Sequence, residues 1–202
     1  MANIPEPPEG GFQIQTPLYK IPPYSEGYWC LVGTWDFDMA VNWFEWFQDP
    51  VYGHHMRMDK VPDLPDYPDG HVETCDWNLM GEGKAYFNAT EAGMVTGRMN
   101  LGDDMGVVVK GGDRWLIQSH FYNTTDQEIW VQDTANIGWL ELEGLEKPLS
   151  TWTFDEVQFE LPPQEESDIV FNCTWPQDVY VVMWMVHMHD RALSFTSEVQ
   201  QE

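Results

Sequence analysis

The sequence has 202 residues, and its 9 Lys and Arg residues against 34 Asp and Glu residues give a formal net charge of −25. This length corresponds to about one domain. So acidic a surface repels phosphate backbones and anionic lipid headgroups, which excludes nucleic acid and membrane surfaces as expected partners. The 11 Trp, 10 Phe and 8 Tyr residues provide ample apolar surface to bury, which excludes a disordered chain.

The first segment, residues 1–11, is rich in proline and has no periodic pattern, so it predicts an extended lead-in. From Phe12 onward, apolar and polar residues alternate in short runs that are bounded by Gly, Pro, Asp or Asn. Runs of this kind, rich in aromatic and β-branched residues, predict β-strands. In chain order they cover residues 28–32, 41–47, 84–88, 105–109, 115–118, 129–131, 138–142, 152–161, 169–173 and 179–189. Residues 59–70, with three prolines and four aspartates, predict a loop.

No stretch of a dozen residues shows the 3.6-residue period of a helix, so the sequence predicts an all-β fold, an antiparallel, jelly-roll-like β-sandwich. We expect a lead-in over residues 1–11, a sandwich domain over residues 12–160 and final strands over residues 161–202. No apolar run reaches the roughly 18 residues of a membrane-spanning helix. The first residues also lack the basic and apolar regions of a secretory signal, so an exported form would have lost its signal.

Two histidines near the end of the chain, His187 and His189, lie two residues apart in a predicted strand. Their side chains therefore point to the same face, with backbones about 6–7 Å apart, and both imidazoles can contact one ion. A solvated strand end is the alternative interpretation of this pair.

The adjacent histidines His54 and His55 present a different problem. Neighbouring strand residues face opposite sides of a sheet, so the two imidazoles can share an ion only where the backbone bends or bulges. Gly53 permits such a bend. A polar loop rim is the alternative interpretation.

A fifth histidine, His120, lies in a predicted strand, on the same face as Gln118. Gln118 can thus serve as a hydrogen-bond partner for a metal-binding imidazole, or it can simply be part of the strand. For His120 itself, the alternative to a ligand is a hydrogen-bonded core residue.

Together these histidines form an ordered pattern. His55 and His120 are 65 residues apart, and His120 and His187 are 67 apart. In order and spacing the chain resembles the copper type II, ascorbate-dependent monooxygenases, the family of peptidylglycine alpha-hydroxylating monooxygenase and dopamine beta-monooxygenase. In that family the motifs His-His-Met, Leu-Gln-x-His-Tyr and His-x-His supply copper ligands. The corresponding motifs here are Gly53-His54-His55-Met56, Ile117-Gln118-Ser119-His120-Phe121-Tyr122 and Val186-His187-Met188-His189. Two flanking segments also resemble those of the family: residues 101–107, which lead to the strand of His120, and the Leu-Pro-Pro turn at residues 161–163.

The resemblance implies a copper-dependent monooxygenase that hydroxylates a C–H bond with O2 and takes electrons from ascorbate. It implies that His54, His55 and His120 hold an electron-transfer copper ion in the first of two sandwich domains. His187 and His189 would be two ligands of a second, oxygen-binding copper ion, whose methionine ligand comes from later in the chain in that family. This chain would end shortly after entering the second domain, which leaves open whether it is active alone.

Three cysteines cannot all pair within one chain. The resemblance implies a disulfide between Cys30 and Cys75, and it gives Cys173 a partner in a C-terminal segment that this chain lacks. It also implies a secreted, periplasmic or secretory-pathway location, where disulfides persist.

Two other interpretations stay open. One is a non-catalytic copper-binding or electron-transfer β-sandwich module, and the other is a structural β-sandwich with a few surface histidines. For the monooxygenase, the expected substrate class covers both small molecules and peptides.

Overall fold

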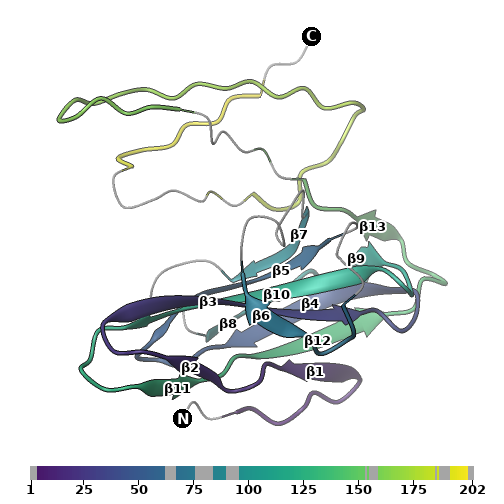
Figure 1. Cartoon of the computed structure of the whole chain (residues 1–202). Coiled ribbons are helices and arrows are strands. Elements are labelled where there is room, and N and C mark those ends of the chain that lie inside the picture. Colours follow the sequence, from purple (N-terminus) through teal and green to yellow (C-terminus); the bar gives the residue numbers. More distant parts are fainter. Residues whose placement is uncertain are drawn as a thin grey trace. The chain divides into compact units, whose positions relative to one another are not determined.

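The structure is a computed structural model (Figure 1) that describes residues 4–61, 67–75, 84–89, 96–152, 154, 159–184, 186 and 192–199. The chain divides into two compact units, Met1–Thr153 and Phe154–Glu202. No helix in the part of the chain that the structure describes is long and apolar enough to cross a membrane.

The first unit consists of short β-strands. They are β1 (Gly11–Gln15), β2 (Tyr19–Ile21), β3 (Ser25–Thr34), β4 (Met39–Phe47), β5 (Gly53–Lys60), β6 (Val72–Thr74), β7 (Lys84–Ala89), β8 (Thr96–Asn100), β9 (Met105–Val109), β10 (Arg114–Asn123), β11 (Ile129–Val131), β12 (Thr134–Leu140) and β13 (Lys147–Leu149). This confirms the predicted all-β fold.

The strands form two larger sheets and one small one. The first sheet has the order β1-β12-β4-β9-β13 with β8 paired to β4, the second has the order β6-β3-β10-β5-β7, and β11 pairs with β2. The pairs are antiparallel except for β13 with β9. The two larger sheets pack as the layers of an antiparallel β-sandwich, as the sequence predicts (Figure 1).

The core lies between the two larger sheets. Phe44 and Ile137 contribute from the first sheet, and Met56 and Ile117 contribute from the second; all four are fully buried. Because side chains alternate along a strand, this places the residues next to Ile117 in β10 on the outer face of the second sheet. His120 is therefore carried on the face that points away from the main core.

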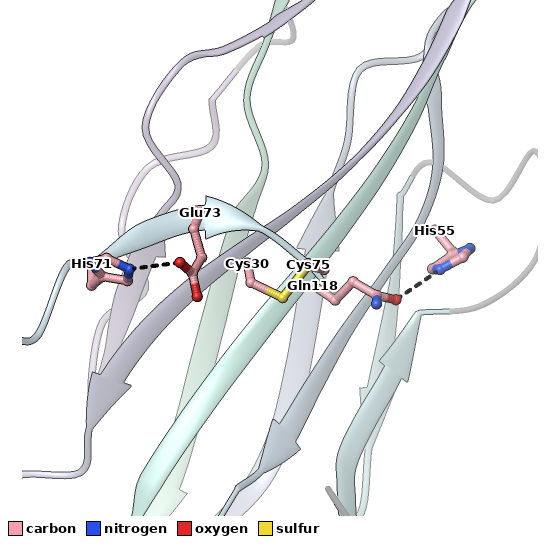
Figure 2. Close-up of a disulfide and its surroundings, with 6 residues drawn as sticks. All are labelled: Cys30, His55, His71, Glu73, Cys75 and Gln118. Atoms are coloured by element: carbon pink, nitrogen blue, oxygen red, sulfur yellow. Dashed lines mark hydrogen bonds and ion pairs between the residues drawn. A yellow bond between two sulfur atoms is a disulfide. The ribbon is translucent and has the colours of Figure 1, made fainter. Parts of the chain in front are cut away.

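A smaller apolar cluster covers one part of that outer face. It contains Cys30, Val32, Val61 and Leu116. Cys30 in β3 is joined to Cys75, just after β6, by a disulfide that spans 45 residues (Figure 2). The pairing that the resemblance implied is confirmed, and a disulfide of this kind indicates an oxidising compartment. Cys173 is free and exposed.

The second unit differs from the sequence prediction. Among its described residues there is no strand, although residues 169–173 and 179–184 have strand-like sequences. The apolar side chains there are exposed, Val170 by 81% and Tyr180 by 98%. A strand needs neighbouring donors and acceptors for its backbone, and the described part of this unit pairs none of these segments with another. The predicted runs 152–161 and 179–189 also include residues outside the described ranges.

The disulfide should be a main source of stability of the first unit. Replacing both Cys30 and Cys75 by alanine should lower the free energy of unfolding by about 4 kcal/mol, because the unfolded chain regains the freedom of a closed 45-residue loop. Urea unfolding measures this loss. Cys173→Ala is the matched control and should leave the unfolding curve unchanged. A loss below about 1 kcal/mol for the double variant would contradict the stabilising role.

Candidate metal centre

Three neighbouring strands bring the first three predicted ligands together. In the second sheet, β10 lies between β3 and β5. His120 in β10 is directly opposite His55 in β5 on one side and Tyr28 in β3 on the other. Residues in such a row project from one face of the sheet, so the pairing register alone puts two histidines and a tyrosine side by side.

A bulge adds the third histidine. His120 pairs with His55, whereas the next residue, Phe121, pairs with Gly53, so His54 is an extra residue in β5. A bulge of this kind redirects a side chain that would otherwise face the opposite side. The structure therefore has, directly after Gly53, the bulge that two adjacent histidines need in order to share an ion.

The three imidazoles approach one another through the same ring atom. Nδ1 of His55 lies 2.9 Å from Nδ1 of His54 and 3.4 Å from Nδ1 of His120. One ligand atom from each of the three histidines lies within 4.8 Å of the others, and the three residues form a group that can hold a metal ion.

These separations match the coordination of a metal ion. Nitrogens that lie about 2.0–2.1 Å from a shared ion, at angles between about 90° and 110°, are about 2.9–3.4 Å apart. Neutral imidazole is a ligand for zinc, copper, iron and nickel. The His54, His55 and His120 group therefore fits an ion with three nitrogen ligands.

The outer nitrogens of two of the rings face oxygen atoms. His55 Nε2 lies 3.2 Å from Oε1 of Gln118, and His120 Nε2 lies 3.2 Å from Oε2 of Glu26 (Figure 2 shows the first contact). An oxygen acceptor at Nε2 favours the tautomer with hydrogen on Nε2 and a free electron pair on Nδ1. Metal-binding histidines characteristically donate their other N–H to such a partner.

Gln118 thus supports a different ring from the one that its sequence position suggests. It shares a face with His120 but contacts His55 on the neighbouring strand β5. Glu26 was not found by the sequence analysis, because it lies 94 residues from His120 and belongs to no local motif.

His120 is suited to bind a cation at neutral pH. It is 1% exposed, and burial lowers the pKa of its imidazole to about 4, although the hydrogen bond to Glu26 acts in the opposite direction. The ring is consequently neutral under ordinary conditions, and a proton does not compete for the electron pair that an ion would use.

Two tyrosines border the group. The Tyr28 ring stacks on His120 with centroids 3.7 Å apart and planes 16° apart. The Tyr122 ring lies 4.8 Å from His54 and 4.7 Å from His120. The register places Tyr28 opposite His120, and Tyr122 follows two residues after His120 in β10, so both tyrosines share its face. They limit the orientations that the imidazoles can take.

The backbone of the bulge is supported from the interior. The Gln48 amide donates one hydrogen bond of 3.0 Å to the His55 carbonyl oxygen and another of 3.0 Å to Oδ2 of Asp133. Gln48 is 1% exposed and Asp133 is fully buried. Burial raises the pKa of the Asp133 carboxyl to about 7. A buried polar pair therefore fixes the segment that carries the two adjacent histidines.

Among the described residues, His71 does not join this group. His71 stacks on Tyr67 with centroids 4.0 Å apart, and its Nε2 lies 3.4 Å from Glu73 (Figure 2). His187 and His189 lie outside the described residues, so the predicted second site is not described.

Comparison with known proteins gives no assignment. No family model matches the chain, and no curated protein matches it.

Replacing Asp133 by asparagine should change how stability depends on pH. Because the carboxyl has a pKa of about 7 in the folded protein and 3.8 as its ordinary value, the folded state keeps a proton that the unfolded chain releases between about pH 4 and pH 7. This carboxyl therefore lowers the free energy of unfolding as the pH rises through that window. The difference in stability between Asp133→Asn and wild type should grow in favour of the variant from pH 4 to pH 7 and then stay constant.

Urea unfolding of both proteins at several pH values measures this difference. His120 also makes stability depend on pH, because its lowered pKa raises the free energy of unfolding as the pH rises from about 4 to 6.5. This contribution is the same in both proteins, so it cancels in the difference between their free energies of unfolding. Asp126→Asn, which removes an exposed carboxyl, controls for the lost charge. A difference between Asp133→Asn and wild type that does not vary with pH would show that Asp133 is ionised throughout.

Proposed function

We propose that this chain carries the electron-transfer copper site of a copper-dependent, ascorbate-using monooxygenase, together with part of the oxygen-binding copper site. The observation that carries the proposal is the convergence of Nδ1 atoms from His54, His55 and His120, which come from positions 65 residues apart. The order and spacing of the histidine motifs support copper as the ion, because they resemble those of the copper type II monooxygenases. Three imidazole side chains are also a suitable donor set for copper.

Each residue of the group has a distinct part in the proposed site. His54, His55 and His120 donate electron pairs from Nδ1, and Gln118 and Glu26 accept the hydrogens on the outer nitrogens of His55 and His120. When bound, copper supplies one-electron transfer, which no side chain of this group provides alone. The protein contributes a fixed ligand geometry, and the buried Gln48 maintains it by holding the His55 carbonyl.

His187 and His189 are proposed as two ligands of the second copper ion. The overall reaction combines a substrate C–H bond, O2, two electrons and two protons to give the hydroxylated product and water. Two ascorbate molecules would each supply one electron. The proposed substrate is a small molecule or a peptide.

A second sandwich domain would account for features of the residues after Phe154. Cys173 is free and exposed, and the side chains of Val170 and Tyr180 are largely exposed. We propose that a further C-terminal segment supplies a partner for Cys173 and pairs with the strand-like segments. The disulfide between Cys30 and Cys75 supports a secreted, periplasmic or secretory-pathway location.

Copper binding should depend on His120. Titration with Cu(I) against a chromogenic competitor should show that His120→Ala loses one equivalent of bound copper, or binds it more than about 100-fold more weakly. Loss of an outer hydrogen-bond partner already lowers metal affinity up to about 100-fold, and loss of a direct ligand should lower it at least as much. His71→Ala is the matched control, since His71 lies outside the group, and it should bind like wild type. Equal stoichiometry and affinity in wild type and His120→Ala would refute the proposed site.

Reduction by ascorbate should become faster as salt is added. The chain carries a net charge of −25 and ascorbate is an anion at neutral pH, so dissolved ions screen their mutual repulsion. Stopped-flow measurement of the Cu(II) signal at increasing ionic strength tests this expectation, with hydroquinone as an uncharged reductant that should show little dependence. A rate with ascorbate that falls as salt is added would instead indicate a cationic docking surface for the reductant.

A further inference from the structure

Glu26 contacts the proposed copper site from β3. It is opposite Tyr122 of β10, and Tyr28, two residues further along β3, is opposite His120. Glu26 and Tyr28 therefore project from the same face of the strand. Tyr28 stacks on the flat side of the His120 ring, whereas Glu26 meets the edge of the ring at Nε2.

The direction of this contact excludes Glu26 as a ligand. Nδ1 of His120 points toward His55, and Glu26 is on the other nitrogen, Nε2, at 3.2 Å. The two nitrogens of an imidazole point away from each other, so a group hydrogen-bonded to Nε2 does not reach an ion held at Nδ1. Glu26 instead accepts the Nε2 hydrogen and selects the tautomer that leaves Nδ1 free.

The carboxylate also makes the two outer hydrogen bonds unequal. His55 faces the neutral amide oxygen of Gln118, whereas His120 faces a carboxylate. Hydrogen bonds to a charged acceptor are stronger than those to a neutral one. The His120 ring is 1% exposed, so little water separates the carboxylate from the ring that would bind the metal. A negative charge there interacts more favourably with Cu(II) than with Cu(I), because the former carries one more positive charge.

Glu26 also faces solvent. Its side chain is 50% exposed, and it lines a shallow pocket of about 460 Å³ together with Tyr24, Ser25, Tyr122, Asn123 and Thr124. The apolar core does not depend on this side chain, so its replacement should leave the fold intact.

We propose that Glu26 is a positioning residue that holds His120 in the Nε2-protonated tautomer and lowers the Cu(II)/Cu(I) reduction potential of the site formed by His54, His55 and His120. The inference rests on the proposed function, since it takes copper as the ion. It assigns to one acidic side chain the control of how readily that site accepts a single electron.

The test compares Glu26→Gln with wild type in both copper oxidation states. Glutamine keeps the size of the side chain and an oxygen acceptor but removes the charge. We expect Cu(II) binding to weaken about tenfold relative to Cu(I) binding, which corresponds to a reduction potential about 59 mV higher for this one-electron couple. Competition titrations measure both dissociation constants, and spectroelectrochemistry measures the potential independently.

Three further variants separate charge from structure. Glu73→Gln is the matched control, because Glu73 also contacts a histidine, His71, outside the group; it should leave the potential unchanged. Glu26→Asp, which keeps the charge on a shorter side chain, should fall between wild type and Glu26→Gln. Gln118→Glu, which adds a carboxylate at the corresponding position on His55, should shift the potential downward.

The outcomes distinguish the inference from the function on which it rests. If wild type binds no copper at the three histidines, the proposed function fails and the inference fails with it. If wild type binds copper there and Glu26→Gln has the same potential, only the inference is overturned. The inference is also overturned if Glu26→Gln weakens the binding of Cu(II) and of Cu(I) to the same extent. It is overturned as well if the Glu26→Gln protein unfolds while Glu26→Asp has the reduction potential of wild type.

Discussion

Three imidazole nitrogens converge at the proposed site, and this convergence is the constraint on which the surrounding structure depends. Nδ1 of His55 lies 2.9 Å and 3.4 Å from the corresponding atoms of His54 and His120. If each ring carries its hydrogen on the outer nitrogen, three electron pairs converge, which is stable when a cation lies between them. The oxygens of Gln118 and Glu26 favour that tautomer for the rings of His55 and His120. The Gln48 hydrogen bond to the His55 carbonyl fixes the bulge that places His54 in the group.

Much of this site could be derived from the sequence because its elements are local. A period of two put His120 and Gln118 on one face, and adjacent histidines after a glycine required a bulge for both to serve one ion. Glu26 could not be found in this way, because its contact with His120 depends on the register between β3 and β10.

The polar strand β5 was not predicted as a strand, since its outward side chains are His, Arg and Asp, and the expected loop over residues 59–70 overlaps its end. By contrast, the apolar strand β9 has the bounds that its sequence predicts.

The residues after Phe154 show where sequence patterns are insufficient. Segments 169–173 and 179–184 have the composition of strands, yet the structure gives them none, because a strand is defined by its hydrogen-bonded neighbour as much as by its own residues. Each predicted run from 28–32 to 138–142 overlaps a strand that has an antiparallel partner, and the pairings of β10 with β3 and β5 create the site. Composition therefore predicted the fold class, whereas pairing determined which segments form sheets.

The central claim is that three histidines of one sheet bind a single copper ion through Nδ1. Anomalous diffraction at the copper edge from a copper-loaded crystal tests it most directly. The account predicts one strong peak bonded to Nδ1 of His54, His55 and His120, with Gln118 and Glu26 still on the outer nitrogens. A peak that is bound through Nε2, that lies away from these three rings or that is coordinated mainly by sulfur would contradict it.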